Sequence, residues 1–466
     1  MVFAFAMMTL AACSREGGSN ETNGTVGTTA DAVDPYPDYL KDKTYDGATV
    51  RLLVATESYG EFFAEEDSEN NMSVAIYNRN LKVMDRHEVE IEYVPEDGPV
   101  VMQNVMLAIV QGGDQSYDIF APSFWWNIGN EGIAANLADI ELLHFDQPWW
   151  YQGWNDALTY LDDSMYYCTG AVNLLTFNSN SVIFMNKGVF EDISVGYKGA
   201  TVEDIQQLVL DGLWTKEVLL EYVKLFGADL DHNNVYDEHD AYGHITGTGA
   251  GSNQLAAWDV SLTFIEAGGE YEWNFFTKGF IEKYEEYGNL LQSANSISTF
   301  NWEAWPYQAF GEDRVLFATA PLNCVGILRQ GDADYTILPL TKYNEAQKEY
   351  RTLGYGAILN AIPGCLIEVD RAAVILEALN YESYQSVMPE FKENTLKNKI
   401  ANDEGTKKML DVIYDSTTSE FAFVHSQKLQ IWGGVMGGTN PNIASAYFSN
   451  EKMYNQLLND ILYNFS

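Results

Sequence analysis

The sequence predicts an α/β fold with a largely parallel sheet, and two observations lead to it. Of the 466 residues, 46% are apolar and 14% are aromatic, which is enough to bury a substantial core. After the first 45 residues, strand-like and helix-like segments alternate, and this order is typical of α/β layer structures. The length suggests about two or three domains.

The individual elements follow from the period of their apolar residues. Residues 48–55 are a β-branched run that predicts a buried strand, and 74–87 have helical spacing. A strand at 88–94, a helix at 101–110 and a short strand at 117–121 complete a β-α-β-α-β order. Further strands are predicted at 166–167, 181–185, 242–246, 315–319, 335–338 and 357–361. Further helices are predicted at 215–226, 254–267, 372–384, 407–415 and from 452 onward.

The charge of the chain excludes several function classes. Lys and Arg number 26 against 67 Asp and Glu, a net charge of −41, so the chain should repel a phosphate backbone and an anionic bilayer. We therefore expect no nucleic acid as a partner. Four scattered cysteines give neither a disulfide framework nor a zinc ribbon.

The N-terminal end is typical of an exported protein. Residues 2–12 form an apolar run too short to span a bilayer, which needs about 20 residues, so residues 1–12 are predicted to be a signal peptide. Leu10-Ala11-Ala12-Cys13 resembles a bacterial lipobox, so lipidation of Cys13 is predicted. Residues 13–44 would be the lipidated cysteine and a flexible tether, rich in Gly, Ser, Thr and Asn. The alternative is a buried N-terminal strand with an ordinary cysteine.

Several segments in one order resemble a known family. They are YDIFAPS (117–123), NLADIELL (136–143), QPWW (147–150), MYYCTGAVN (165–173), SVIFMNKGVFED (181–192), DLDHNNVYDEHDAYG (229–243), ILPLTKYNEAQKEY (337–350) and RAAVILEALNYES (371–383). They are similar to extracellular family 1 solute-binding proteins of ABC importers, the maltose-binding type, specifically lipoproteins of Gram-positive bacteria. The resemblance implies a two-lobed periplasmic-binding-protein-like fold with discontinuous lobes joined by crossing strands. Lobe 1 would be 45–169 and 319–369, and lobe 2 would be 170–318 and 370–466.

The resemblance also implies the partners and the place of action. A carbohydrate would bind between the lobes, an ABC permease in the membrane would receive it, and the protein would be a monomer. It would be held by its lipid at the extracellular face of the cell membrane.

One acidic segment predicts a calcium site. Its oxygen donors lie at positions 1, 3, 5, 7, 9 and 12 of an EF-hand-type loop, with position 7 supplying a backbone carbonyl: Asp229, Asp231, Asn233, Val235, Asp237 and Asp240. Two departures are Asn234 at position 6, where Gly is usual, and Asp240 in place of Glu. Ca²⁺ is therefore the one cofactor expected, in a structural role. A solvated acidic loop without metal, and zinc bound through His232, His239 or His244, are the alternatives.

Aromatic and polar residues together predict a carbohydrate site, because sugar C–H faces stack on rings and hydroxyl groups pair with polar side chains. The candidates taken from such mixtures are Ser123, Trp125, Trp126, Asn127, Trp302, Trp305, Tyr355 and Trp432. The first four directly follow a predicted strand, where ligands of open parallel sheets bind. The resemblance adds Glu57, Ser58, Asn173 and Asn323.

No motif of an enzyme stands out. There is no G-x-S-x-G, no phosphate-binding G-x-x-x-x-G-K-[ST], and Gly247 to Ser252 lacks the third glycine of a dinucleotide fingerprint. We expect a binding protein without catalysis. A secreted carbohydrate-active enzyme and a surface glycan-adhesion module remain as alternatives, and the ligand could also be an oligopeptide or another organic molecule.

Overall fold

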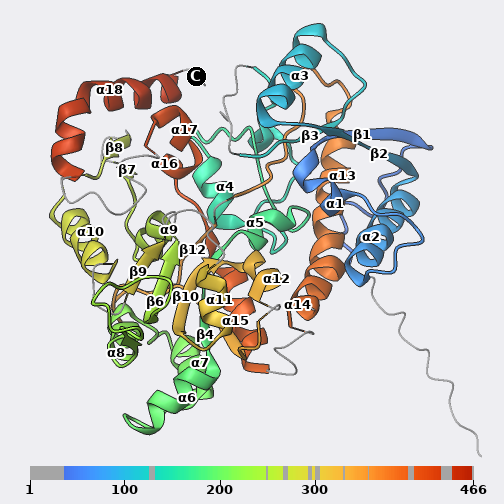
Figure 1. Ribbon diagram of the computed structural model, residues 1–466. Coiled ribbons are helices and arrows are strands. Elements are labelled where there is room, and N and C mark those ends of the chain that lie inside the picture. The colour runs from blue at the N-terminus through green and yellow to red at the C-terminus, as the bar shows by residue number, and fades with distance from the viewer. Residues whose placement is uncertain are drawn as a thin grey trace, which may run out of the picture.

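The computed structural model describes residues 36–124, 132–247, 250–265, 271–275, 277–291, 296–299, 305–328, 331–354, 356–396, 404–431 and 443–463. Figure 1 shows the arrangement of their helices and strands. The predicted signal peptide, Cys13 and all of the tether before Tyr36 lie outside these residues. No helix among the described residues is both long and apolar enough to span a membrane.

The first sheet has the order β2-β1-β3, with β1 at Ala48–Ala55, β2 at Val89–Glu96 and β3 at Ile119–Ala121, all parallel. Val50, Leu52, Leu53 and Val54 of β1 are buried, as the β-branched run predicts. Helices α2 (Asn71–His87) and α3 (Pro99–Gly112) connect the strands. Asn70 accepts the N–H of Met72 and so caps the start of α2. We call this sheet and the elements packed on it lobe 1.

The second sheet has the order β11-β4-β10-β6-β5, with β9 also paired to β6. Its strands are β4 (Ser181–Asn186), β5 (Gly227–Ala228), β6 (Ala241–Gly247), β9 (Ser296–Thr299), β10 (Val315–Pro321) and β11 (Tyr335–Pro339). Since β4 runs antiparallel to both β10 and β11, the prediction of a largely parallel sheet holds for the first sheet, whereas the second sheet is mixed. This sheet and its covering helices are lobe 2.

The other elements are helices and short turns that connect and cover these strands. The described helices not yet named are α1 (Tyr59–Phe62), α4 (Gln152–Leu158), α5 (Leu174–Asn178), α6 (Lys187–Val195), α7 (Val202–Leu210), α8 (Lys216–Val223), α9 (Ala250–Ala257), α10 (Lys278–Leu291), α11 (Trp305–Gly311), α12 (Val325–Leu328), α13 (Val369–Glu382), α14 (Met388–Leu396), α15 (Glu404–Asp415), α16 (Phe421–Val424), α17 (Ser426–Leu429) and α18 (Ile443–Tyr463). Short 3-10 turns lie at η1 (Thr56–Ser58), η2 (Leu137–Asp139) and η3 (Leu322–Cys324), and η4 (Ser383–Val387) is a π-helix.

One predicted helix is wrong. The apolar spacing at 254–267 suggested a single helix, but α9 ends at Ala257 and Asp259 adopts a left-handed backbone with φ 57°. The chain then forms β7 (Thr263–Ile265), which pairs with β8 (Tyr271–Trp273) as a hairpin. Trp258 is nevertheless a core residue, 1% exposed, as its place in the apolar stripe predicted.

The lobes are joined where segments distant in sequence pair closely. Strand β12 (Thr352–Leu353) pairs with β13 (Thr417–Thr418), Asn180 bridges to Gly354, and Cys168 bridges to Asn360. At Gly354 a side chain would not fit, because a Cβ there would lie 2.5 Å from the Ser179 hydroxyl and 3.2 Å from the backbone nitrogen of Asn180. We call residues 168–180, 352–354, 356–360 and 416–420 the crossing region.

Two segments belong to a different lobe from the one predicted for them. Strand β11, assigned to lobe 1 from the resemblance, pairs with β4 and so belongs to the second sheet. Helices α13 and α14, assigned to lobe 2, pack on α2 of lobe 1, as Figure 1 shows for the orange α13 beside the blue α2. Both differences arise because sequence similarity places the ends of a lobe only coarsely. The remaining lobe boundaries stay predictions.

Candidate functional site

Half of the predicted carbohydrate contacts cannot be placed. The residues that lie outside the described part of the chain are Trp125, Trp126, Asn127, Trp302, Tyr355 and Trp432. The others can be located, and they fall at two sheet edges and in the crossing region.

The lobe 1 candidates lie at the carboxyl ends of β1 and β3. Glu57 and Ser58 form η1 directly after β1, and Ser123 follows β3, which is the hydrogen-bonded neighbour of β1. Glu57 is exposed, whereas Ser58 and Ser123 are 0% and 4% exposed. Neither serine hydroxyl has a hydrogen-bond partner in the described chain. The parallel pairing therefore brings all three predicted residues to one edge of the sheet.

Asn173 has a structural position instead of the predicted contact with a ligand. It is fully buried, and its Oδ1 accepts the side-chain N–H of Asn360 at 2.6 Å and the backbone N–H of Gly170 at 3.2 Å. Its own Nδ2 points back to Asn360 Oδ1 at 3.4 Å. Because both amide atoms are used within the crossing region, a solute cannot reach them in this conformation.

The two lobe 2 candidates lie on the elements directly before and after β10. Asn323 is exposed in η3, immediately after the carboxyl end of β10. Trp305 starts α11, and its ring lies 6.2 Å from that of Tyr242, near the start of β6. Two residues along the same helix, the hydroxyl of Tyr307 lies 3.3 Å from Cys324 Sγ, next to Asn323, so α11 also approaches the carboxyl edge of β10. The contact of Trp305 with a solute stays a prediction.

Helix α5 brings the two sheet edges together. Its first backbone N–H groups, at Leu174 and Leu175, bond the carboxyl group of Glu61 from the end of α1, and η3 packs against the same helix. Glu61 therefore links the loop of Glu57 and Ser58 to the segment that enters lobe 2. The sequence carried no signal for this role, because one Glu among many acidic residues forms no motif.

Burial changes the protonation of Glu61. Desolvation raises its pKa to about 8, and the bonds from Leu175 and Leu174 lower the pKa only in part. Its Oε2 atom is buried without a partner in the described chain. Buried Arg79 provides a nearby positive charge, and it donates to the backbone oxygens of Glu61 and Phe62 at 3.0 and 2.8 Å.

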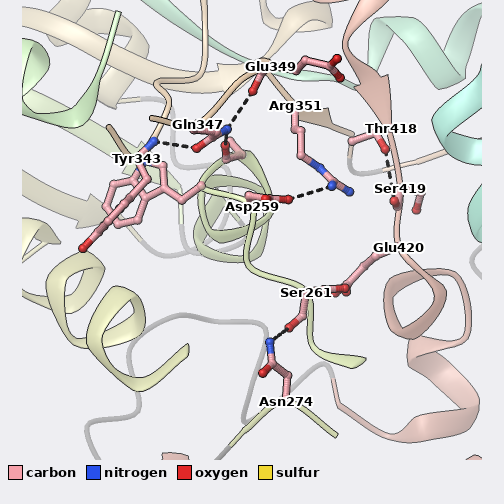
Figure 2. A network of polar contacts seen from close by, with 12 residues as sticks. Asp259, Ser261, Asn274, Tyr343, Gln347, Glu349, Arg351, Thr418, Ser419 and Glu420 are labelled. Atoms are coloured by element: carbon pink, nitrogen blue, oxygen red, sulfur yellow. Dashed lines mark hydrogen bonds and ion pairs between the residues drawn. The ribbon is translucent and has the colours of Figure 1, made fainter. Parts of the chain in front are cut away.

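A second polar network lies beside the crossing region and is drawn in Figure 2. Glu420, directly after Ser419, accepts the hydroxyl of Ser261 and the backbone N–H of Leu262, the latter at 2.8 Å. Arg351 donates to Asp259 at 2.9 Å. Desolvation raises the pKa of Glu420 to about 7, although these two bonds and Arg351 act in the opposite direction. The network fixes the loop after α9 to both ends of the paired strands β12 and β13.

Three of the six predicted calcium ligands converge. One carboxylate oxygen from each of Asp229, Asp231 and Asp240 lies within 4.8 Å of the others. The fully buried Asp240 accepts the backbone N–H groups of Leu230 and Asp237 at 2.8 and 2.9 Å. At position 6, Asn234 adopts φ 60°, the left-handed backbone that Gly usually provides there.

The other three predicted ligands are less convergent. Asn233 uses Oδ1 to accept the backbone N–H of Val235 at 2.5 Å, and Asp237 Oδ1 accepts that of His239 at 2.9 Å. For the zinc alternative, His244 is buried on β6 and its Nε2 lies 2.9 Å from Thr319 Oγ1. That position takes His244 out of the loop. His232 and His239 remain in the loop, but the group that converges consists of three carboxylates, whose hard oxygen atoms suit Ca²⁺.

Comparison with known proteins gives the same architecture. No protein-family model and no curated protein sequence matches the chain. A cyclo/maltodextrin-binding protein solved with maltotetraose is 12% identical, with a TM-score of 0.54 over 90% of this chain and 97% of that one. M. tuberculosis UspC is 10% identical, with a TM-score of 0.55 over 88% of this chain and 100% of that one.

A third similar structure is the galacto-N-biose/lacto-N-biose I-binding protein of an ABC transporter from Bifidobacterium longum, solved with lacto-N-biose. It is 11% identical, with a TM-score of 0.51 over 90% of this chain and 99% of that one. The agreement extends over nearly the whole of each chain and confirms the fold expected from the sequence. The chain has the two-lobed α/β fold of the maltose-binding type of solute-binding proteins.

Proposed function

We propose that this protein is the substrate-binding lipoprotein of an ABC importer and captures a mono- or oligosaccharide between its lobes, without altering it chemically. The observation that carries the proposal is the meeting of two sheet edges at α5. Glu57, Ser58 and Ser123 lie at the carboxyl edge of the first sheet, and Asn323 lies at that of the second. Ligands of open α/β sheets bind outside such edges.

The chemistry of these residues supports a neutral, hydroxyl-rich solute. A carboxylate accepts hydrogen bonds, an amide both accepts and donates them, and serine hydroxyls do both, so the set matches the alternating donors and acceptors of a sugar. The three similar structures include two that were solved with bound oligosaccharides. Rotation about the crossing region would close the lobes on the solute, and the extent of closure depends on how much more strongly the closed form binds it.

A glycan panel tests this proposal. We expect isothermal titration calorimetry to give heat with at least one mono- or oligosaccharide, and E57Q and N323A to weaken that binding by at least about fivefold, because each removes a polar contact of about 1 kcal/mol or more. E217Q, on an exposed position of α8, is the matched control. Release of reducing sugar from a polysaccharide would instead favour an enzyme, and no heat with any glycan would refute the proposal.

We propose in addition that the 229–240 loop binds Ca²⁺. Three carboxylates within 4.8 Å repel one another unless a cation lies among them, and carboxylate oxygens are ligands that Ca²⁺ prefers. Residues Asp229, Asp231 and Asp240 would hold the ion, which would supply positive charge to this loop. Millimolar CaCl₂ should raise the melting temperature of the wild type but not that of D231N, with D259N as control. An unchanged melting temperature in the wild type would count against the site.

The anchor belongs to the same proposal. We infer that Cys13 carries a lipid that holds the protein at the extracellular face of the membrane, where a permease of the importer receives the solute. The lipobox-like Leu10-Ala11-Ala12-Cys13 supports it. Labelling with a clickable fatty acid in a bacterial host should mark the wild type and not C13S; labelling of both would refute lipidation at this residue.

A further inference from the structure

Helices α14 and α15 follow one another in the sequence but belong to different lobes. Helix α14 packs on α2 and on the π-helix η4, on the side of the first sheet. Helix α15 packs on β11 and α7, on the side of the second sheet. Any rotation of one lobe against the other must therefore change how α14 and α15 lie relative to each other.

Two ion pairs join these helices directly. Lys392 of α14 contacts Asp411 of α15 at 2.6 Å, and Lys407 of α15 contacts Glu393 of α14 at 3.1 Å. Lys407 also approaches Glu404 of its own helix, at the longer distance of 3.9 Å. The two pairs have opposite polarity, since each helix supplies one lysine and one carboxylate. In a chain with 26 basic residues against 67 acidic ones, two lysines in one interlobe contact are notable.

Solvent reaches both pairs through a pocket of about 420 Å³ between the helices. All four charged residues line it, and the rings of Tyr384 and Tyr414 form part of its apolar wall, 6.0 Å apart. Lys392 Nζ also lies 4.8 Å from the centre of the Tyr414 ring. The chain continues from Tyr414 directly into β13 of the crossing region, so the pocket lies beside the place where the lobes pivot.

We propose that these two ion pairs are an electrostatic latch that sets the equilibrium between lobe arrangements. The latch stabilises the lobe arrangement described here. Breaking the latch shifts the population toward an arrangement in which the lobes are rotated against each other. This inference rests on the proposed function for its biological meaning, since lobe closure is what captures a solute. Exposed ion pairs are individually weak, so the latch shifts a population and does not lock it. Because the pairs are solvent-accessible, salt screens them, with a Debye length of about 10 Å at 0.1 M and about 3 Å at 1 M.

The test measures the distance between the lobes without any solute. Spin labels on Q111C of α3 and E203C of α7, in the full chain carrying C13S and C365S, report the distance by pulsed electron paramagnetic resonance. Both positions are exposed, and they lie in lobe 1 and lobe 2. We expect K392A, D411A, K407A and E393A each to change the ratio of the distance populations in the same direction, by about 2- to 5-fold per pair. Raising NaCl from 20 to 500 mM should produce the same change in the wild type.

Coupling between the partners separates the latch from unspecific effects. The double variant K392A/D411A should match either single variant, and the exchanged pair K392D/D411K should restore the wild-type ratio. The control is K198A, which breaks the Lys198–Glu221 pair of 2.7 Å within lobe 2 and should leave the ratio unchanged. Unchanged distances in the four latch variants, or an equal change in K198A, would overturn the inference. Because no solute is present, this outcome is independent of whether any glycan binds.

Discussion

Replacement of Glu377 by Gln should destabilise lobe 1 strongly, and the structure allows the effect to be worked out. Glu377 lies on α13 and is fully buried. Its Oε1 accepts the hydroxyl of Tyr39 at 2.7 Å and the indole N–H of Trp149 at 2.9 Å. Its Oε2 accepts the indole N–H of Trp150 at 3.1 Å and the backbone N–H of His144 at 3.3 Å.

A glutamine keeps one oxygen acceptor and turns the other into an N–H₂ donor. Two of the four N–H and O–H donors then face this N–H₂ group and lose their acceptor. The loss of each hydrogen bond to a charged acceptor costs about 1.5–3 kcal/mol. Part of this cost is offset, because burial raises the pKa of Glu377 and the neutral amide no longer carries a buried charge. We therefore expect E377Q to lower the free energy of unfolding by about 2–4 kcal/mol.

Guanidinium unfolding followed by tryptophan fluorescence measures this change, and Trp149 and Trp150 themselves report on the site. Y39F removes a single donor and should cost about 1 kcal/mol. E368Q, at an exposed position next to the same helix, should cost less than about 0.5 kcal/mol. If E377Q is no more destabilising than E368Q, the four hydrogen bonds do not carry the stability assigned to them here.

Three further outcomes follow from the structure. G354A should destabilise the crossing region by about 1–3 kcal/mol, because the added methyl meets Ser179 at 2.5 Å; an unchanged melting temperature would contradict the close packing. Burial lowers the pKa of His244 to about 4, so the unfolded chain takes up its proton first as the pH falls. Unfolding free energy should thus drop by about 2 kcal/mol between pH 7.5 and pH 5, and H244N should remove that part of the drop. N173A and N360A should reduce the free energy of unfolding equally and change the affinity for the solute equally. A loss of affinity in N173A alone would instead indicate that Asn173 contacts the solute.

The sequence predicts the helices and strands correctly where the spacing of apolar residues alone determines them. The buried run at β1 and the helical spacing of α2 both lie where they were predicted, because each is a local pattern. The helix predicted over 254–267 failed, since the chain turns at the left-handed Asp259, which a polar residue can permit without any change in apolar spacing. The placement of β11 and of α13 depends on contacts between distant segments, which no local pattern contains.

The candidate site shows the same division. Ser58 and Asn323, which the family resemblance assigned to the loops after two strands, do lie directly after β1 and β10, and their contact with a solute stays a prediction. Asn173 also lies at the crossing, where the resemblance placed it, but its pairing with Asn360 joins positions 187 residues apart and no local pattern contains it. Glu61 went unnoticed for a similar reason: its function depends on α5, which the sequence places more than 100 residues away.

The central claim is that two lobes pivot at the crossing region to enclose a sugar. The most direct test measures the distance between spin labels on Q111C and E203C before and after a sugar is added. The sugar is the oligosaccharide that gives the largest calorimetric heat. The account predicts a shift toward a single shorter distance whose dependence on sugar concentration follows the calorimetric dissociation constant. A distance that stays constant while the sugar binds would show that the lobes form a rigid unit, and would contradict the account.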